Sequence, residues 1–101
     1  MADHSNAWAC SSALAAATAE SFEITSPEAR WLELVHLGDQ TQAVWYIVGS
    51  AVTAPTVAGD GCRPLLAGER IRVGRAGHAA STVVTFISSG TPFVSVEGVK
   101  G

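Results

Sequence analysis

Charged side chains are scarce in this sequence. Asp, Glu, Lys and Arg make up 15% of its 101 residues, whereas soluble domains usually carry about 25%. The surface must therefore be rich in apolar or small side chains. We expect a partner molecule to cover part of it.

Positive charge is also in short supply. Six Lys and Arg residues against nine Asp and Glu give a formal net charge of −3 at pH 7, which creates no field that attracts nucleic-acid phosphates. No apolar run approaches the roughly 20 residues that span a bilayer, and the start of the chain lacks the basic flank of a signal peptide. We expect no nucleic-acid or membrane partner, and a protein kept in a cytoplasm.

Sequence signatures of catalysis and metal binding are missing. The sequence has no glycine-rich phosphate loop and no nucleophile elbow. Its histidines, His4, His36 and His78, do not have the spacing of a zinc site. We expect no enzyme activity, no cofactor and no metal.

Cysteine is limited to Cys10 and Cys62, and a reducing compartment would keep both as thiols that are not bonded to each other. A chain this short buries only about 60–65% of the surface that its unfolded form exposes. Small domains without a metal or disulfides often gain stability by association. Both points favour an oligomer.

Short runs of alternating apolar and polar residues recur every ten to twelve positions, separated by Gly, Pro, Asp or Ser. This spacing is typical of a β-sandwich or barrel. We predict an all-β fold, a small antiparallel β-sandwich or jelly-roll-like barrel of about seven strands over residues 21–101, preceded by an N-terminal arm over residues 1–20. The predicted strands cover 21–25, 30–37, 43–48, 64–66, 69–74, 82–88 and 93–97. The segments 49–61 and 75–81 are predicted as loops.

The strand predicted over 43–48 has no polar face. One alternating set is Val44, Tyr46 and Val48, and the other is Ala43, Trp45 and Ile47. We therefore predict a central strand that is covered on both sides, with Trp45 in the core. Trp31 is expected in the core as well.

The strand predicted over 69–74 is half-buried. Ile71 and Val73 are expected to face the core, and Arg70 and Arg72 the solvent. Together with Arg75, the outward arginines form a basic stripe. It is either an ordinary exposed face or a contact to an acidic partner.

The N-terminal arm is rich in alanine. Residues 11–20 favour a helix by propensity, but their small side chains also suit an extended arm or added strand, which we favour. Such a segment has too little apolar bulk to order itself. We therefore predict that residues 1–20 contact another subunit through Trp8 and Leu14.

Several segments together carry a family resemblance. They are the Ala/Thr-rich arm, Ala29-Arg30-Trp31-Leu32-Glu33-Leu34, Ala43-Val44-Trp45-Tyr46-Ile47-Val48-Gly49, Asp60-Gly61, Pro64-Leu65-Leu66-Ala67-Gly68-Glu69 and Phe86-Ile87-Ser88-Ser89-Gly90-Thr91-Pro92-Phe93-Val94-Ser95-Val96. Their order resembles small virion structural proteins of tailed bacteriophages, of the capsid-decoration or head-spike-base type. The sequence departs from that family at His36 and Leu37, which replace Asn-Thr-Gly-like turn residues, and in a longer segment at 75–80.

The resemblance implies a non-enzymatic virion protein that assembles as a homo-oligomer, a trimer or a pentamer for example, on a major capsid protein or another virion protein. Assembly would take place in the cytoplasm of the bacterial host. The residues expected at the interface are Trp8, Leu14, Trp45, Arg70, Arg72 and Arg75. Two alternatives are a tail-associated phage protein and a monomeric β-sandwich that binds carbohydrate or peptide through Trp31, Trp45 or Tyr46.

Overall fold

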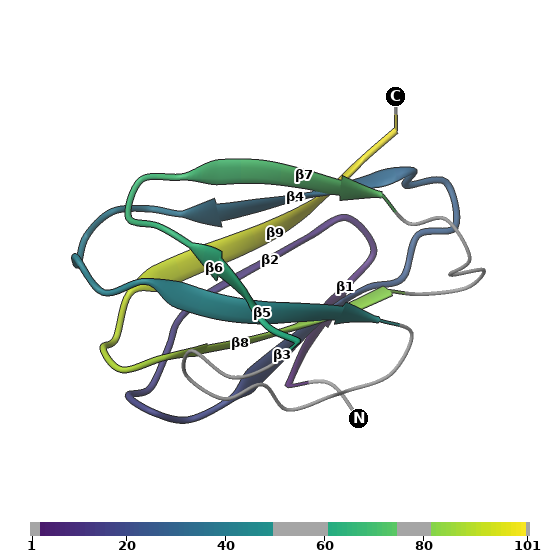
Figure 1. The fold of residues 1–101 in the computed structure, drawn as a ribbon. Helices are drawn as coiled ribbons and strands as arrows, with labels where there is room; N and C mark the ends of the chain where they lie inside the picture. The colour runs from purple at the N-terminus through teal and green to yellow at the C-terminus, as the bar shows by residue number, and fades with distance from the viewer. Residues whose placement is uncertain (1–2, 50–60, 75–81, 101) are drawn as a thin grey trace.

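The computed structural model describes residues 3–49, 61–74 and 82–100. These residues form nine strands in two sheets that pack face to face, which confirms the predicted all-β sandwich (Figure 1). The strands are β1 (His4–Asn6), β2 (Ala9–Ala13), β3 (Glu20–Ile24), β4 (Trp31–His36), β5 (Val44–Gly49), β6 (Arg63–Leu65), β7 (Arg70–Gly74), β8 (Thr82–Ser88) and β9 (Phe93–Val99). The described part of the chain contains no helix that could span a membrane.

The chain passes repeatedly from one sheet to the other. The five-stranded sheet has the order β1-β3-β8-β5-β6, and the four-stranded sheet has the order β2-β9-β4-β7. Only the connection from β5 to β6 stays within one sheet. All strand pairs are antiparallel except β1 with β3. This topology makes β1, β6, β2 and β7 the edge strands.

All seven predicted strands are present, with ends that differ by about two residues or less. Their turns follow ordinary chemistry. The turn between β6 and β7 closes with a 2.8 Å hydrogen bond from the Glu69 N–H to the Leu66 carbonyl, and Gly68 takes the positive φ of 78° that such a turn requires. Of the segments predicted as loops, 49–61 and 75–81, residues 50–60 and 75–81 lie outside the described residues.

The strand that is buried on both faces is β8, not β5. Strand β8 lies in the middle of the five-stranded sheet, and its outward residues Val83, Thr85 and Ile87 are buried as fully as its inward ones. On β5 the outward Trp45 and Ile47 are only half-buried. The predicted double coverage of β5 is therefore wrong, because its outer neighbour β6 has only three residues and leaves that face close to the sheet edge.

An aromatic row runs through the core. Phe22 of β3, Phe86 of β8 and Tyr46 of β5 lie on the inner face of the five-stranded sheet and meet edge to face, with ring centroids 5.3 Å and 6.4 Å apart. This is the geometry that aromatic quadrupoles prefer. Tyr46 ends the row on the side of β6 and β7.

His36 is a structural residue of the core. It is fully buried, and its Nδ1 accepts a 3.0 Å hydrogen bond from the Gly38 N–H. The proton of the neutral ring therefore lies on Nε2, which donates to the Gln42 carbonyl at 2.8 Å. These two bonds hold the loop between β4 and β5.

The N-terminal arm does not exist as a separate unit. Residues 3–20 contribute β1 to one sheet and β2 to the other, and β2 pairs with β9 along its whole length. Leu14 is 2% exposed in the core of its own chain. Trp8 lies against Gly98 of β9, where an added Cβ would be 3.1 Å from the indole ring. The predicted boundary at residue 20 is therefore wrong, because the small side chains of this segment fit beside β9 of the same chain. The buried Leu14 cannot anchor a contact with another subunit; a contact through the exposed side of the segment stays a prediction.

Candidate functional site

Three of the four edge strands carry a feature that hinders further pairing. Strands β1 and β6 have three residues each, and Pro64 in β6 lacks an N–H. Strand β7 has five residues, but Arg70 and Arg72 are exposed along it. Short edges, prolines and charged side chains are the usual devices that keep sheet edges from pairing.

Strand β2 lacks these devices. The hydrogen bonds from the Leu14 N–H to the Pro92 carbonyl, at 2.9 Å, and from the Gly98 N–H to the Trp8 carbonyl, at 2.6 Å, frame its pairing with β9. Since the register alternates, the backbone groups of Cys10 and Ser12 also face β9. Those of Ala9, Ser11 and Ala13 point away from the sheet; we call these three residues the open edge.

The open edge is exposed and uncharged. Ala9, Ser11 and Ala13 are all exposed. Two backbone groups have local side-chain contacts: the Ala9 N–H donates to Asn6 Oδ1 at 3.3 Å, and the Ala13 carbonyl accepts from Ser12 Oγ at 3.1 Å. The N–H and carbonyl of Ser11 have no partner among the described residues. The open edge therefore offers backbone hydrogen bonds, and its own three residues carry no bulky or charged side chain.

Arg70 and Arg72 face the solvent as predicted, and they bind within their own sheet. Both reach Glu33 on the neighbouring strand β4, Arg70 at 2.5 Å and Arg72 at 3.4 Å. Glu33 holds a central position between them, opposite Arg72 in the register. The acidic group that meets this stripe is therefore a residue of the same chain.

The residues predicted at an interface are not brought together. Trp45 is on the outer face of the five-stranded sheet, whereas Arg70 and Arg72 are on the outer face of the four-stranded sheet. Leu14 is inside. Arg75 lies outside the described residues.

The tryptophan expectations are also corrected. Trp31 was expected in the core but is 39% exposed, because it is at the outward start of β4, where its ring covers Gly74 at 3.5 Å from the position of an added Cβ. Trp45 is half-buried on the opposite side of the molecule, and Tyr46 points inward. These three aromatic residues cannot form one ligand platform.

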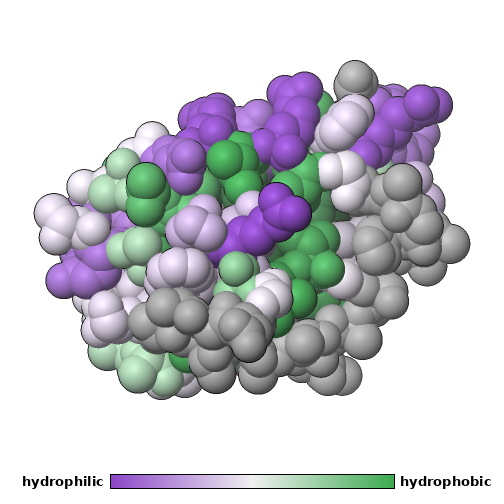
Figure 2. Space-filling view, viewed as in Figure 1, coloured by the Kyte–Doolittle hydropathy of each residue, from purple (hydrophilic) through white to green (hydrophobic). Residues whose placement is uncertain are grey.

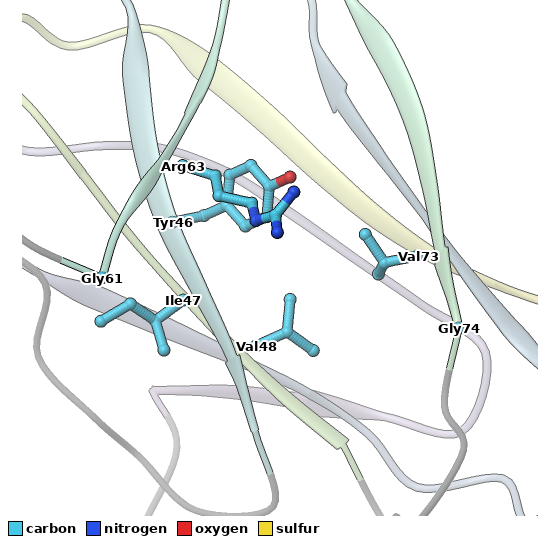
Figure 3. Close-up of a pocket in the computed structure, with 7 residues that line it drawn as sticks. All are labelled: Tyr46, Ile47, Val48, Gly61, Arg63, Val73 and Gly74. Carbon is cyan, nitrogen blue, oxygen red and sulfur yellow. The ribbon is translucent and has the colours of Figure 1, made fainter.

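A cleft opens between the two sheets, on the side away from the open edge. It has a volume of about 340 Å³ and lies between β5 and β6 of one sheet and β7 of the other (Figure 3). Its walls include Tyr46, Val48, Arg63 and Val73. Figure 2 shows hydrophobic residues on this face of the molecule, between the levels of β7 and β5.

A second hollow of about 300 Å³ lies near the N-terminus and includes Asp3, His4 and Glu20. Its polar groups are paired with each other or with the sheet. His4 Nε2 is 2.5 Å from Glu20 Oε1, and Asp3 Oδ2 accepts from the N–H and the hydroxyl of Ser21, at 2.9 Å and 3.2 Å. These contacts fasten β1 to β3. No group of three or more metal-ligating side chains is present among the residues that the structure describes.

Cys10 and Cys62 are not joined by a disulfide. Cys10 is a buried thiol of β2 whose Sγ is 3.6 Å from the Glu23 carbonyl. Burial, and to a lesser extent the negative charge of Glu23, raise the pKa of this thiol. It is a structural residue with little thiolate character.

Sequence reasoning missed the open edge and the cleft. The segment Ala9–Ala13 contains only Ala, Ser and Cys, so it has no apolar alternation that would mark a strand. Tyr46 and Arg63 are opposite each other in the register of β5 and β6, and a long intervening segment hides that pairing in the sequence. A scan for uncharged Ser- and Ala-rich segments would have found the segment that forms the open edge.

No family model matches the sequence, and no curated protein matches it. Among solved structures, the chain is similar to the pre-peptidase C-terminal domain of a collagenase from Bacillus anthracis. The TM-score is 0.51 at 7% sequence identity, over 96% of this chain and 93% of that domain. A likeness at this identity shows a shared β-sandwich fold alone.

Proposed function

We propose that this protein is a non-catalytic structural protein that assembles with copies of itself by pairing strand β2 with β2 of a second copy. The observation that supports this proposal is the contrast between the open edge and the other three edge strands of the described sandwich. An edge with unpaired backbone groups is a template for another strand. Natural sheets usually block such an edge, and β2 leaves it accessible.

The open edge is complementary to itself. If two copies meet antiparallel about a two-fold axis at Ser11, the Ser11 residues of both copies face each other and Ala9 of each copy faces Ala13 of the other. All three residues present backbone groups to the same side, so every facing pair can exchange two hydrogen bonds. The two four-stranded sheets then form one continuous sheet.

The side chains favour a second copy over a larger or charged partner strand. Each copy carries a net charge of −3, yet β2 itself has no charged residue, so like charges do not meet at the junction. The side chains of Ala and Ser on the outer face are small enough to let the two sheets approach. A two-fold symmetric contact of this kind is the commonest form of protein self-association.

The expected affinity is modest. Three facing pairs supply about six backbone hydrogen bonds, each worth about 1 kcal/mol net. Association costs at least about 4 kcal/mol of rigid-body freedom, and Ala9 must give up its contact with Asn6. At about 1–1.5 kcal/mol per bond, about 2–5 kcal/mol remains after these costs, so we expect a dissociation constant of about 0.2–30 mM. Dense packing of copies on a larger particle would favour such a weak contact by raising their local concentration.

A bacteriophage virion is the setting that the sequence resemblance suggests for such assembly, as a capsid decoration or spike-base protein or as a tail-associated protein. That location stays a prediction. A census of virion proteins by mass spectrometry would test it, and the chain should appear there in many copies.

Sedimentation velocity over a wide range of concentrations tests self-assembly through β2. We expect a reversible dimer that the variant Ser11→Pro abolishes, because proline removes the outward N–H of Ser11 without removing a hydrogen bond to β9. The matched variant Ser11→Thr keeps the N–H and should dimerise like the original chain. A mass that stays at that of the monomer up to about 10 mM protein, or a dimer that Ser11→Pro leaves intact while the chain stays folded by circular dichroism, would contradict the proposal.

A further inference from the structure

The cleft between the sheets combines apolar walls with two polar groups at one end. Val48 of β5 and Val73 of β7 face it from opposite sheets, and Tyr46 and Arg63 lie together where β5 meets β6 (Figure 3). The volume of about 340 Å³ is near the lower end of the range for ligand sites, roughly 300–1,000 Å³. The space therefore suits a small molecule.

Tyr46 is a buried phenol without a hydrogen-bond partner. The residue is only 5% exposed, and no atom of the described residues forms a hydrogen bond with its hydroxyl group. Burial raises the pKa of this hydroxyl, against the opposing effect of the nearby Arg63 charge, and the Glu69 carboxylate adds a smaller effect that also raises it; the group therefore keeps its proton at neutral pH. Leaving a buried hydroxyl unsatisfied is costly, which points to a ligand that accepts a hydrogen bond there.

Arg63 is the second donor. It is exposed, and it has no carboxylate partner among the described residues. Arg70 and Arg72, in contrast, both bind Glu33. A guanidinium beside a phenol is a pair of donors that matches the two oxygens of a carboxylate.

We propose that this cleft binds a small monocarboxylate with a short aliphatic body. The carboxylate accepts hydrogen bonds from the Arg63 guanidinium and the Tyr46 hydroxyl, and the aliphatic body lies between Val48 and Val73. An inorganic anion would use the donors but leave the valines without contact. An aliphatic alcohol would contact the valines but would offer the two donors a single uncharged oxygen.

Titration of the isotope-labelled protein with hexanoate, followed by NMR, tests the site. We expect shifts that saturate at millimolar hexanoate and are centred on β5, β6 and the end of β7. Hexan-1-ol and inorganic phosphate, as separate probes, should each bind at least about tenfold more weakly. Equal affinity for hexan-1-ol would contradict the role of the donors, and equal affinity for phosphate would contradict the aliphatic body.

Two variants assign the donors, and a third is the control. Tyr46→Phe removes only the hydroxyl, and Arg63→Gln removes the charge; we expect each to weaken hexanoate binding about tenfold. Arg72→Gln removes the same charge as Arg63→Gln, but from the outer face of β7, and should leave the affinity for hexanoate unchanged. Because the Tyr46 hydroxyl has no hydrogen-bond partner among the residues that the structure describes, Tyr46→Phe should unfold at the same or a higher urea concentration than the original protein. Unchanged hexanoate affinity in both Tyr46→Phe and Arg63→Gln would overturn the proposal.

Discussion

Replacing Ser11 with lysine places a positive charge at the centre of the proposed β2–β2 contact. The two Ser11 residues would face each other with Cα atoms about 5.5 Å apart. Two ammonium groups about 6 Å apart repel each other by about 1–3 kcal/mol, depending on how far water screens them. The dissociation constant of Ser11→Lys should therefore rise by about five- to 150-fold.

Ser95→Lys is the matched control. Ser95 is the direct neighbour of Ser11 on β9, so it adds the same charge to the same outer face, one strand further in. Two such lysines in the pair of copies would be about 15 Å apart, beyond the Debye length of about 8–10 Å. This variant should dimerise almost like the original chain.

Mixing a positively charged variant with a negatively charged one should restore the contact that either charge alone weakens. Ser11→Lys and Ser11→Glu should each be poor dimers alone, and an equimolar mixture should form a heterodimer at least as stable as the original dimer. Sedimentation velocity with one variant fluorescently labelled measures the association of each variant alone and of the mixture. Equal weakening by Ser11→Lys and Ser95→Lys, or no heterodimer in the mixture, would refute the two-fold contact at Ser11.

Three further predictions concern the fold. Gly98→Ala should lower the free energy of unfolding by about 1–3 kcal/mol, because the new Cβ would be 2.9 Å from the Ala29 Cβ; Gly74→Ala, with its nearest contact at 3.5 Å, should cost far less in the same urea titration. His36→Phe should cost about 1–3 kcal/mol, because the Gly38 N–H and the Gln42 carbonyl of the β4–β5 loop lose their hydrogen bonds to the buried ring, and a loss below about 0.5 kcal/mol would contradict that role. Cys10 should react with iodoacetamide at pH 8 at least about tenfold more slowly than an unfolded cysteine, because burial raises its thiol pKa; brief labelling read by peptide mass spectrometry measures this rate.

The sequence predicted the strands with strong β-branched alternation, such as β5 and β8, and it failed where side chains are small. In β2 the residues are Ala, Cys and Ser, which suit a helix, an arm or a strand almost equally. Pairing with β9 decides between these forms, and that pairing joins residues 80 to 88 positions apart. Single-sequence patterns carry no such information.

The prediction that β5 is buried on both faces, when β8 is, failed for a related reason. Both β5 and β8 are apolar on both faces, so alternation alone cannot say which one is in the middle of the sheet. The order of strands depends on the crossings between sheets. The cleft was missed for the same reason, because the pairing of Tyr46 with Arg63 exists only in the folded register of β5 and β6.

Amide hydrogen exchange, resolved by NMR at several protein concentrations, tests the central claim most directly. The outward N–H groups of Ser11 and Ala13 should exchange more slowly as the concentration rises, because they become hydrogen-bonded in the dimer. The N–H of Ser12 already faces β9, and that of Arg72 is on the opposite edge, so neither rate should show the same dependence. Rates at Ser11 and Ala13 that do not change up to about 10 mM protein, or that change no more than the rate at Arg72, would contradict self-assembly through the open edge.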